Sequence, residues 1–214
     1  MASDGRTVVG GWELLLSSTR TVFLLAGPSG SGKSRVARKA GVPTLNLDDF
    51  YYGADHPGLP HTRGIIDWDD ALTWNGPAAA EAIKELARTG RAEVPRYDIS
   101  TSAAVGTRTV DLGDASCFIA EGIFAIESAA FCRNANVEFV ACYLDRPTWL
   151  VTLLRFVRDV RERRKPFPVL VRRGLALSRT DSELRRRAMA AGFRPVGPAE
   201  ALEMVAAPVR SRQQ

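Results

Sequence analysis

The chain has 214 residues, of which 45% are hydrophobic and 25% are charged, and its formal net charge is +5. This is typical of a soluble globular domain with one sizeable core, and no apolar stretch approaches the roughly 20 residues that cross a bilayer. The three cysteines, Cys117, Cys132 and Cys142, lack metal-ligand spacing, which argues against a zinc site and favours buried, reduced thiols. Residues 1–20 lack a secretory pattern, so we expect a cytoplasmic protein.

The first predicted elements surround a glycine-rich loop. Thr21–Ala26 has the pattern of a buried strand, and Ser34–Ala40 is compatible with a helix that ends at Gly41. Between them, GPSGSGKS at residues 27–34 has the spacing of a P-loop, whose backbone N–H groups and helix N-terminus suit a polyphosphate. In such a loop the lysine reaches the β- and γ-phosphates and the serine hydroxyl ligates Mg²⁺. We therefore predict an ATP and Mg²⁺ site formed by Gly27, Ser29, Gly30, Ser31, Gly32, Lys33, Ser34 and Arg35.

Further strands and helices alternate along the chain. Strands are predicted at 42–47, 116–120 and 137–144, with a short extended stretch at 92–99. Helices are predicted from Asn75 to Gly90, from Pro147 onward, and from Thr180, in a capping box with Glu183, to Gly192. This order predicts an α/β fold of three layers, with helices on both faces of a parallel sheet and ligand groups at the carboxyl ends of the strands.

The basic residues are concentrated in one segment. Residues 155–187 contain twelve Lys/Arg and four Asp/Glu, whereas the rest of the chain is net negative. Such a segment can bind nucleic acid, or it can form a lid that closes over an anionic nucleotide. Because the P-loop favours the second use, we expect a single P-loop kinase domain over residues 1–214 with an Arg-rich helical lid at about 155–187.

The acids at the predicted strand ends narrow the choice among P-loop proteins. A GTPase would show an Asn-Lys-x-Asp segment, and a motor ATPase would show adjacent Asp-Glu after an apolar strand; the chain has neither feature. A small-molecule kinase needs a carboxylate near the acceptor hydroxyl, a second carboxylate near Mg²⁺, and arginines that close over the phosphates. Asp48, Glu121 and the arginines of residues 155–164 can supply these groups.

Six motifs in the same order resemble the uridine kinase family of P-loop nucleoside kinases. They are GPSGSGKS at 27–34, LDDFY at 47–51, IDWDDA at 66–71, PRYD at 95–98, IAEGIFA at 119–125 and RFVRDVRER at 155–163. The resemblance implies an ATP-dependent kinase whose acceptor is a nucleoside such as uridine or cytidine. It also implies a possible homo-oligomer, because members of the family often form oligomers.

The resemblance also implies roles for individual residues. Asp48 would be the general base that deprotonates the acceptor hydroxyl, with Tyr51 beside it, and Glu121 would lie by Mg²⁺. Lid residues Arg158 and Arg163 would act on the phosphates. The acceptor would be bound by Tyr51, Asp67, Tyr97, Ser102 and Arg155, where Asp67 bonds the sugar hydroxyls, Tyr97 packs on the base and Arg155 faces the acceptor.

The chain departs from the family pattern at the base-reading position. Ser102 in YDISTSAA stands where the family has a histidine, and Ala104 stands where an arginine is common. The acceptor can therefore also be a non-nucleoside alcohol, such as a sugar or vitamin, as in the phosphoribulokinase and pantothenate kinase relatives of the fold. A nucleotide-dependent switch or a nucleic-acid-associated ATPase is the alternative from another class, although we expect a small-molecule partner rather than nucleic acid or a membrane.

Overall fold

A five-stranded parallel sheet forms the centre of the computed structural model, which describes residues 20–62, 64–147, 149–151, 153–154 and 181–211. Its strands are β1 (Thr21–Ala26), β2 (Thr44–Asn46), β7 (Cys117–Glu121), β8 (Phe139–Leu144) and β9 (Arg194–Val196), in the spatial order β2-β7-β1-β8-β9. All neighbouring strands run parallel. The predicted lid arginines, Arg155, Arg158 and Arg163, lie outside the described residues.

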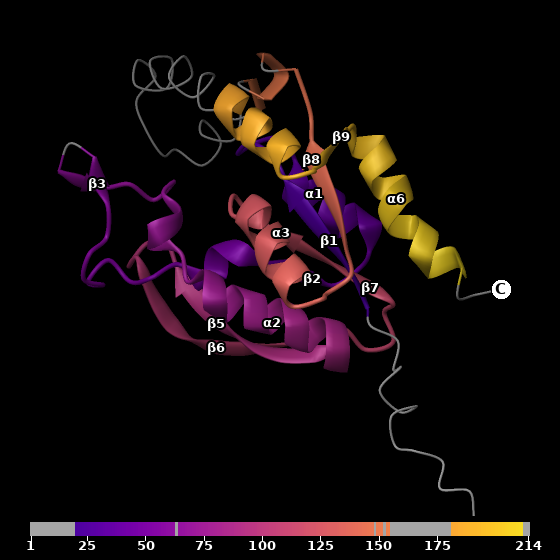
Figure 1. The fold of residues 1–214 in the computed structure, drawn as a ribbon, viewed down its shortest axis with the longest axis horizontal. Coiled ribbons are helices and arrows are strands. Elements are labelled where there is room, and N and C mark those ends of the chain that lie inside the picture. Colours follow the sequence, from indigo (N-terminus) through magenta and orange to yellow (C-terminus); the bar gives the residue numbers. More distant parts are fainter. Residues whose placement is uncertain (1–19, 63, 148, 152, 155–180, 212–214) are drawn as a thin grey trace, which may run out of the picture.

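Helices cover both faces of this sheet (Figure 1). Along β1, Val22 and Leu24 face one apolar core and Phe23 and Leu25 face the other, as the alternation of side chains in a strand requires. The first core is closed by α2 (Gly76–Thr89), α3 (Ala125–Asn134) and the helical residues 181–190, and the second by α1 (Lys33–Ala40) and α6 (Pro198–Ser211). The predicted three-layer α/β fold is confirmed.

Local capping explains where two of the predicted helices begin and end. The side chain of Asn75 accepts a hydrogen bond from the N–H of Ala78 at the start of α2, and Gly90 ends that helix at a φ of 82°. Gly41 ends α1 in the same way, at a φ of 66°. Since a left-handed residue at this position is easiest for glycine, both ends follow from the sequence.

The structure adds elements that the sequence pattern did not predict. The extended stretch at 92–99 is one arm, β5 (Arg91–Asp98), of an antiparallel hairpin whose other arm is β6 (Ala103–Asp111). The strand predicted at 42–47 ends at Asn46, because Asn46 caps the short 3₁₀ helix η2 (Leu47–Phe50) through the N–H of Asp48. The other additions are β3 (His61–Thr62), β4 (Ile65–Ile66), η3 (Ala71–Thr73), α3, β9 and α6.

The three cysteines are buried and form no disulfide, as predicted. Burial raises the pKa of both the Cys132 and Cys142 thiols to about 11, which keeps them protonated and unreactive at neutral pH. Among the described helices, none has both the length and the apolar character to span a membrane.

Candidate active site

The P-loop runs from the end of β1 into α1, where glycine is required by the packing. Gly27 has a φ of 148°, and a Cβ there would lie 3.1 Å from both the carbonyl oxygen of Leu144 and the hydroxyl oxygen of Ser31. Gly32, with a φ of 97°, precedes the first residue of α1. The loop therefore holds the N-terminal N–H groups of α1 at the carboxyl edge of the sheet, which is the usual arrangement for binding phosphate.

The loop encloses a buried cation and an unpaired hydroxyl group. The Nζ of Lys33 donates hydrogen bonds to the carbonyl oxygens of Gly27 at 2.7 Å and Pro28 at 3.2 Å, and the side chain is 8% exposed. Ser31 is fully buried, and its hydroxyl oxygen has no hydrogen-bond partner in the described part of the chain. A buried hydroxyl without a partner is rare in folded proteins. These groups fit the phosphate chain of a nucleotide.

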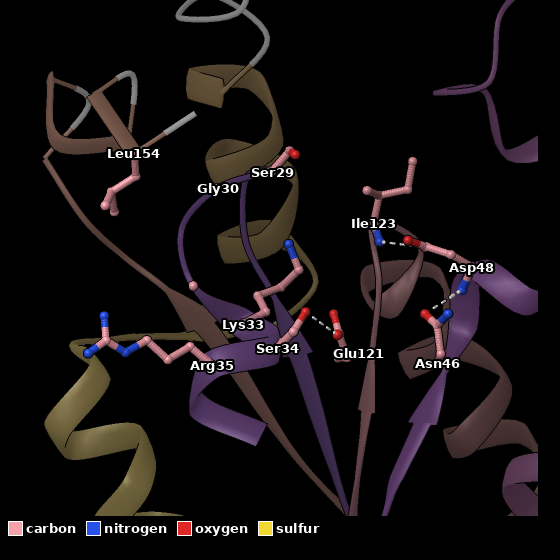
Figure 2. Close-up of a pocket in the computed structure, with 11 residues that line it drawn as sticks. Ser29, Gly30, Lys33, Ser34, Arg35, Asn46, Asp48, Glu121, Ile123 and Leu154 are labelled. Carbon is pink, nitrogen blue, oxygen red and sulfur yellow. Dashed lines mark hydrogen bonds between the residues drawn. The ribbon is translucent and has the colours of Figure 1, made fainter. Parts of the chain in front are cut away.

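Ser34 and Glu121 form the part of the site that suits Mg²⁺. The hydroxyl of Ser34 donates to Oε1 of Glu121 at 2.7 Å (Figure 2). Glu121 ends β7, which lies between β1 and β2, and this register brings it beside α1. Within the described ranges no three His, Cys, Asp or Glu side chains are grouped closely enough to hold a metal alone. Mg²⁺ commonly takes one or two protein oxygens and completes its shell with water and substrate phosphates, so the pair fits that ion.

Asp48 lies across the site from the P-loop and is held at its backbone and its carboxylate. Its N–H donates to Oδ1 of Asn46 at 3.2 Å, and its Oδ1 accepts from the N–H of Ile123 at 3.4 Å (Figure 2). Burial raises the pKa of Asp48 to about 6, opposed by the nearby charge of Lys33 and reinforced by that of Glu121. A carboxylate with this pKa is ionised at pH 7 and is still a better base than an ordinary aspartate.

One pocket of about 460 Å³ joins these groups. Its lining residues are Ser29, Gly30, Gly32, Lys33, Ser34, Arg35, Asn46, Asp48, Glu121, Ile123 and Leu154. In Figure 2 the side chain of Arg35 projects away from Asp48, toward the opposite side of the loop. The pocket thus combines the P-loop, the Ser34–Glu121 pair and the candidate base Asp48, which come from β1, β2, β7 and the elements that follow them.

Two curated uridine kinases are similar to this chain over most of its sequence. The uridine kinase of Ureaplasma parvum is 26% identical over 157 residues, which cover 70% of this chain and 74% of that protein. The uridine kinase of Geobacillus kaustophilus is 28% identical over 167 residues, which cover 74% of this chain and 76% of that protein. This chain is thus similar in sequence to uridine kinases over 70–74% of its length.

A solved structure supports the same fold. The structure assigned to a fructose transport system kinase of Silicibacter sp. TM1040 aligns with 86% of this chain and 90% of its own, with a TM-score of 0.55 and 16% identity. No protein-family model matches the chain.

Two residues predicted to bind the acceptor, Tyr51 and Asp67, lie outside the pocket lining and form hydrogen bonds elsewhere. The hydroxyl of Tyr51 donates to the carbonyl oxygen of Trp68 at 2.9 Å, and its ring packs against Trp68, Tyr97 and Phe124. The carboxylate of Asp67 accepts from the hydroxyl of Thr62 at 3.1 Å and from the N–H of Asp69 at 3.3 Å. Both carboxylate oxygens of Asp67 therefore hold its own loop together.

The other two described acceptor residues lie in the β5–β6 hairpin. The hydroxyl of Tyr97 donates to the carbonyl oxygen of Tyr52 at 3.4 Å. Ser102 has a left-handed φ of 49°, its hydroxyl donates to the carbonyl oxygen of Ile99 at 3.5 Å, and its own carbonyl oxygen accepts from the N–H of Ala54 at 2.8 Å. The hydroxyl of Ser102 thus interacts with its own turn and with the side chain of Tyr97.

Sequence reasoning missed several residues that build the site. Asn46 and Ile123 hold Asp48, and Leu154 lines the pocket. The guanidinium of Arg108 on β6 pairs with Asp49 at 3.0 Å, next to the candidate base. Only Asn46 has a signal in the sequence, because asparagine two residues before an acidic turn is a common cap; the others depend on contacts between distant segments.

Proposed function

We propose that the chain is an ATP- and Mg²⁺-dependent kinase that transfers the γ-phosphoryl group to a hydroxyl of a small molecule, with a nucleoside such as uridine or cytidine as the leading acceptor. The observation that carries the proposal is the single pocket shared by Lys33, the Ser34–Glu121 pair and Asp48. A phosphate-binding loop alone is found in proteins of many functions. Activation of an acceptor hydroxyl also requires a base opposite the loop, and the buried carboxylate of Asp48, with its raised pKa, has that position.

The chemistry then follows from the positions of these side chains. Asp48 accepts the proton of the acceptor hydroxyl while that oxygen bonds to the γ-phosphorus and the bond from the γ-phosphorus to the bridging oxygen of ADP breaks. Lys33 supplies a buried positive charge to the phosphates, and bound Mg²⁺ would neutralise further charge. The protein has little covalent chemistry to perform, so positioning and electrostatic stabilisation account for the rate. Arg158 and Arg163 stay proposed lid residues.

A second acceptor class, a non-nucleoside alcohol, is favoured by one observation. Ser102 occupies the base-reading position of the family pattern, and its hydroxyl is engaged within the hairpin, by the carbonyl oxygen of Ile99 and the side chain of Tyr97. A pyrimidine would then have to be recognised by other groups. We also propose the cytoplasm as the location, where ATP is available and the buried thiols stay reduced.

The test is ADP release with MgATP across a panel of nucleosides, sugars and vitamin alcohols. We expect stimulation by uridine or cytidine, with no stimulation in Lys33→Ala. Stimulation only by a sugar or vitamin alcohol would keep the mechanism and replace the acceptor. Tight ATP binding without stimulation by any acceptor would contradict the kinase proposal and favour a nucleotide-dependent switch.

A further inference from the structure

Arg146 brings a second positive charge to the P-loop from a different strand. It follows β8, which pairs in parallel with β1 and matches Tyr143 to Ala26. The carboxyl end of β8 therefore lies beside the start of the loop, as the close approach of Leu144 to Gly27 also shows. Arg146 does not belong to any of the motifs that the chain shares with the uridine kinase family.

The guanidinium of Arg146 lies against the loop and lacks an anionic partner among the described residues. One of its terminal nitrogens is 3.7 Å from the position that a Cβ would take at Gly32. Its Nε is buried and forms no hydrogen bond within the described chain. The preceding acid, Asp145, pairs instead with Arg185, at 3.0 and 3.1 Å, within the part of the chain that the structure describes.

A buried guanidinium donor without a partner is costly, and five N–H groups in a planar fork match the oxygens of a phosphate. The P-loop lies next to this guanidinium and is the part of the site where phosphate oxygens would bind. Its own lysine, Lys33, donates hydrogen bonds to two carbonyl oxygens of the loop. We propose that Arg146 binds the phosphate chain of the nucleotide held by residues 27–34. This inference rests on the proposed function only in taking the P-loop as a nucleotide site, and it does not depend on the acceptor.

Binding measured without an acceptor tests the inference. The full chain is titrated calorimetrically with MgATP, with tripolyphosphate and with adenosine, as wild type, Arg146→Gln, Arg146→Lys and the control Arg91→Gln. Arg91 is exposed and belongs to the β5–β6 hairpin, so its replacement removes a charge away from the loop. We expect Arg146→Gln to weaken MgATP and tripolyphosphate about tenfold or more, because charge-assisted hydrogen bonds are lost, whereas adenosine binding and the Arg91→Gln variant stay unchanged.

Three outcomes overturn the inference. Wild-type affinity for MgATP in Arg146→Gln would show that the guanidinium does not reach the phosphates, and an equal loss for adenosine would place it on the base or ribose. If Arg146→Gln does not fold, as judged by its thermal unfolding, Arg146→Lys decides: a severalfold loss supports the inference, and unchanged affinity rejects it. A wild-type chain that binds neither MgATP nor tripolyphosphate would instead refute the nucleotide site and, with it, the proposed function.

Discussion

Asp48 shows how a single carboxylate acquires the properties of a base. Its position is set by the cap at Asn46 and by the N–H of Ile123, and burial beside Lys33 and Glu121 sets its pKa at about 6. The close approach of Gly122 is part of the same arrangement, because a Cβ there would lie 2.7 Å from Oδ1 of Asp48. From the pKa of Asp48 and its contact with Gly122 we derive three predictions about activity and stability.

Asp48→Asn is expected to lower kcat by about 10²- to 10⁴-fold, because asparagine cannot accept the proton of the acceptor. The affinity for MgATP, measured without acceptor, should change little, since Lys33 and the loop are untouched. Asp111→Asn, which removes an exposed carboxylate on β6, is the matched control. A kcat of Asp48→Asn within a few-fold of wild type would mean that Asp48 is not the base.

Asp48→Asn should also stabilise the fold at neutral pH. The pKa of Asp48 is raised from 3.8 to about 6 in the folded chain, so its ionisation opposes folding: stability is full below about pH 3.8 and is lost as the pH rises through 6. The variant is therefore expected to gain up to about 3 kcal/mol in the free energy of unfolding at pH 8 and to match wild type near pH 4. Urea unfolding at both pH values measures this, and equal stability at pH 8 would contradict it.

Gly122→Ala is expected to reduce kcat at least about tenfold, because the added methyl group displaces the carboxylate of Asp48 and small misplacements of a reacting group are costly. Binding of MgATP should be retained. Gly197→Ala serves as the control, since a Cβ at Gly197 meets nothing within 4 Å and no strained φ is present there. If Gly122→Ala turns over at the wild-type rate, the carboxylate is less constrained than the packing indicates.

At the level of secondary structure, the β5–β6 hairpin is joined to the 3₁₀ helix that carries the candidate base Asp48. Arg108 on β6 and Asp49 in η2 form an ion pair at 3.0 Å, with Asp49 largely buried and Arg108 partly exposed. Because η2 also contains Asp48, this pair links the hairpin to the candidate base. The hairpin therefore contributes to the site although none of its residues lines the pocket.

Removing this link should cost about 0.5 to 1 kcal/mol in stability, as expected for a partly exposed ion pair. A double-mutant cycle with Asp49→Asn and Arg108→Gln, followed by urea unfolding, measures the coupling between the two side chains. Additive effects of the two substitutions would show that the pair contributes nothing.

The sequence predicts those elements whose signals are local. The P-loop with its flanking strand and helix, and the ends of α2 at Asn75 and Gly90, depend on residues next to one another. The strand β6 was missed because its residues show no regular alternation of buried and exposed side chains, and Gly106 interrupts the stretch. It forms a strand because it pairs with β5 across the hairpin. The bonds that hold Asp67 within its own loop depend on β3 and β4, which are too short to be recognised from sequence.

At the scale of the whole molecule, parallel topology brings the site together. The sequence places Asp48 and Glu121 after separate strands, and the order β2-β7-β1 puts those strand ends at one edge beside the P-loop. Sequence reasoning could anticipate that meeting, because the carboxyl ends of parallel strands share an edge. It could not anticipate Arg146, which belongs to no motif and reaches the loop only through the pairing of β8 with β1.

The helical residues 181–190, which include the end of the predicted lid, are attached to the same framework. Arg187 pairs with Glu127 on α3, and Arg185 pairs with Asp145 just after β8. These two ion pairs fix the helical residues 181–190 against the face of the sheet that α3 covers. The end of the basic segment is thereby anchored close to the strand that carries Arg146.

The central claim is that the pocket transfers a phosphoryl group from ATP to a hydroxyl, and the most direct measurement follows that group itself. ATP labelled in the γ-phosphoryl group is incubated with Mg²⁺, uridine and the wild-type, Lys33→Ala or Asp48→Asn chain, and the nucleotide products are separated. We expect labelled uridine monophosphate from wild type and almost none from either variant. The proposed transfer would be contradicted if the label stayed in ATP or appeared only as free phosphate. This result would have to hold for uridine and for every other nucleoside, sugar and vitamin alcohol tested.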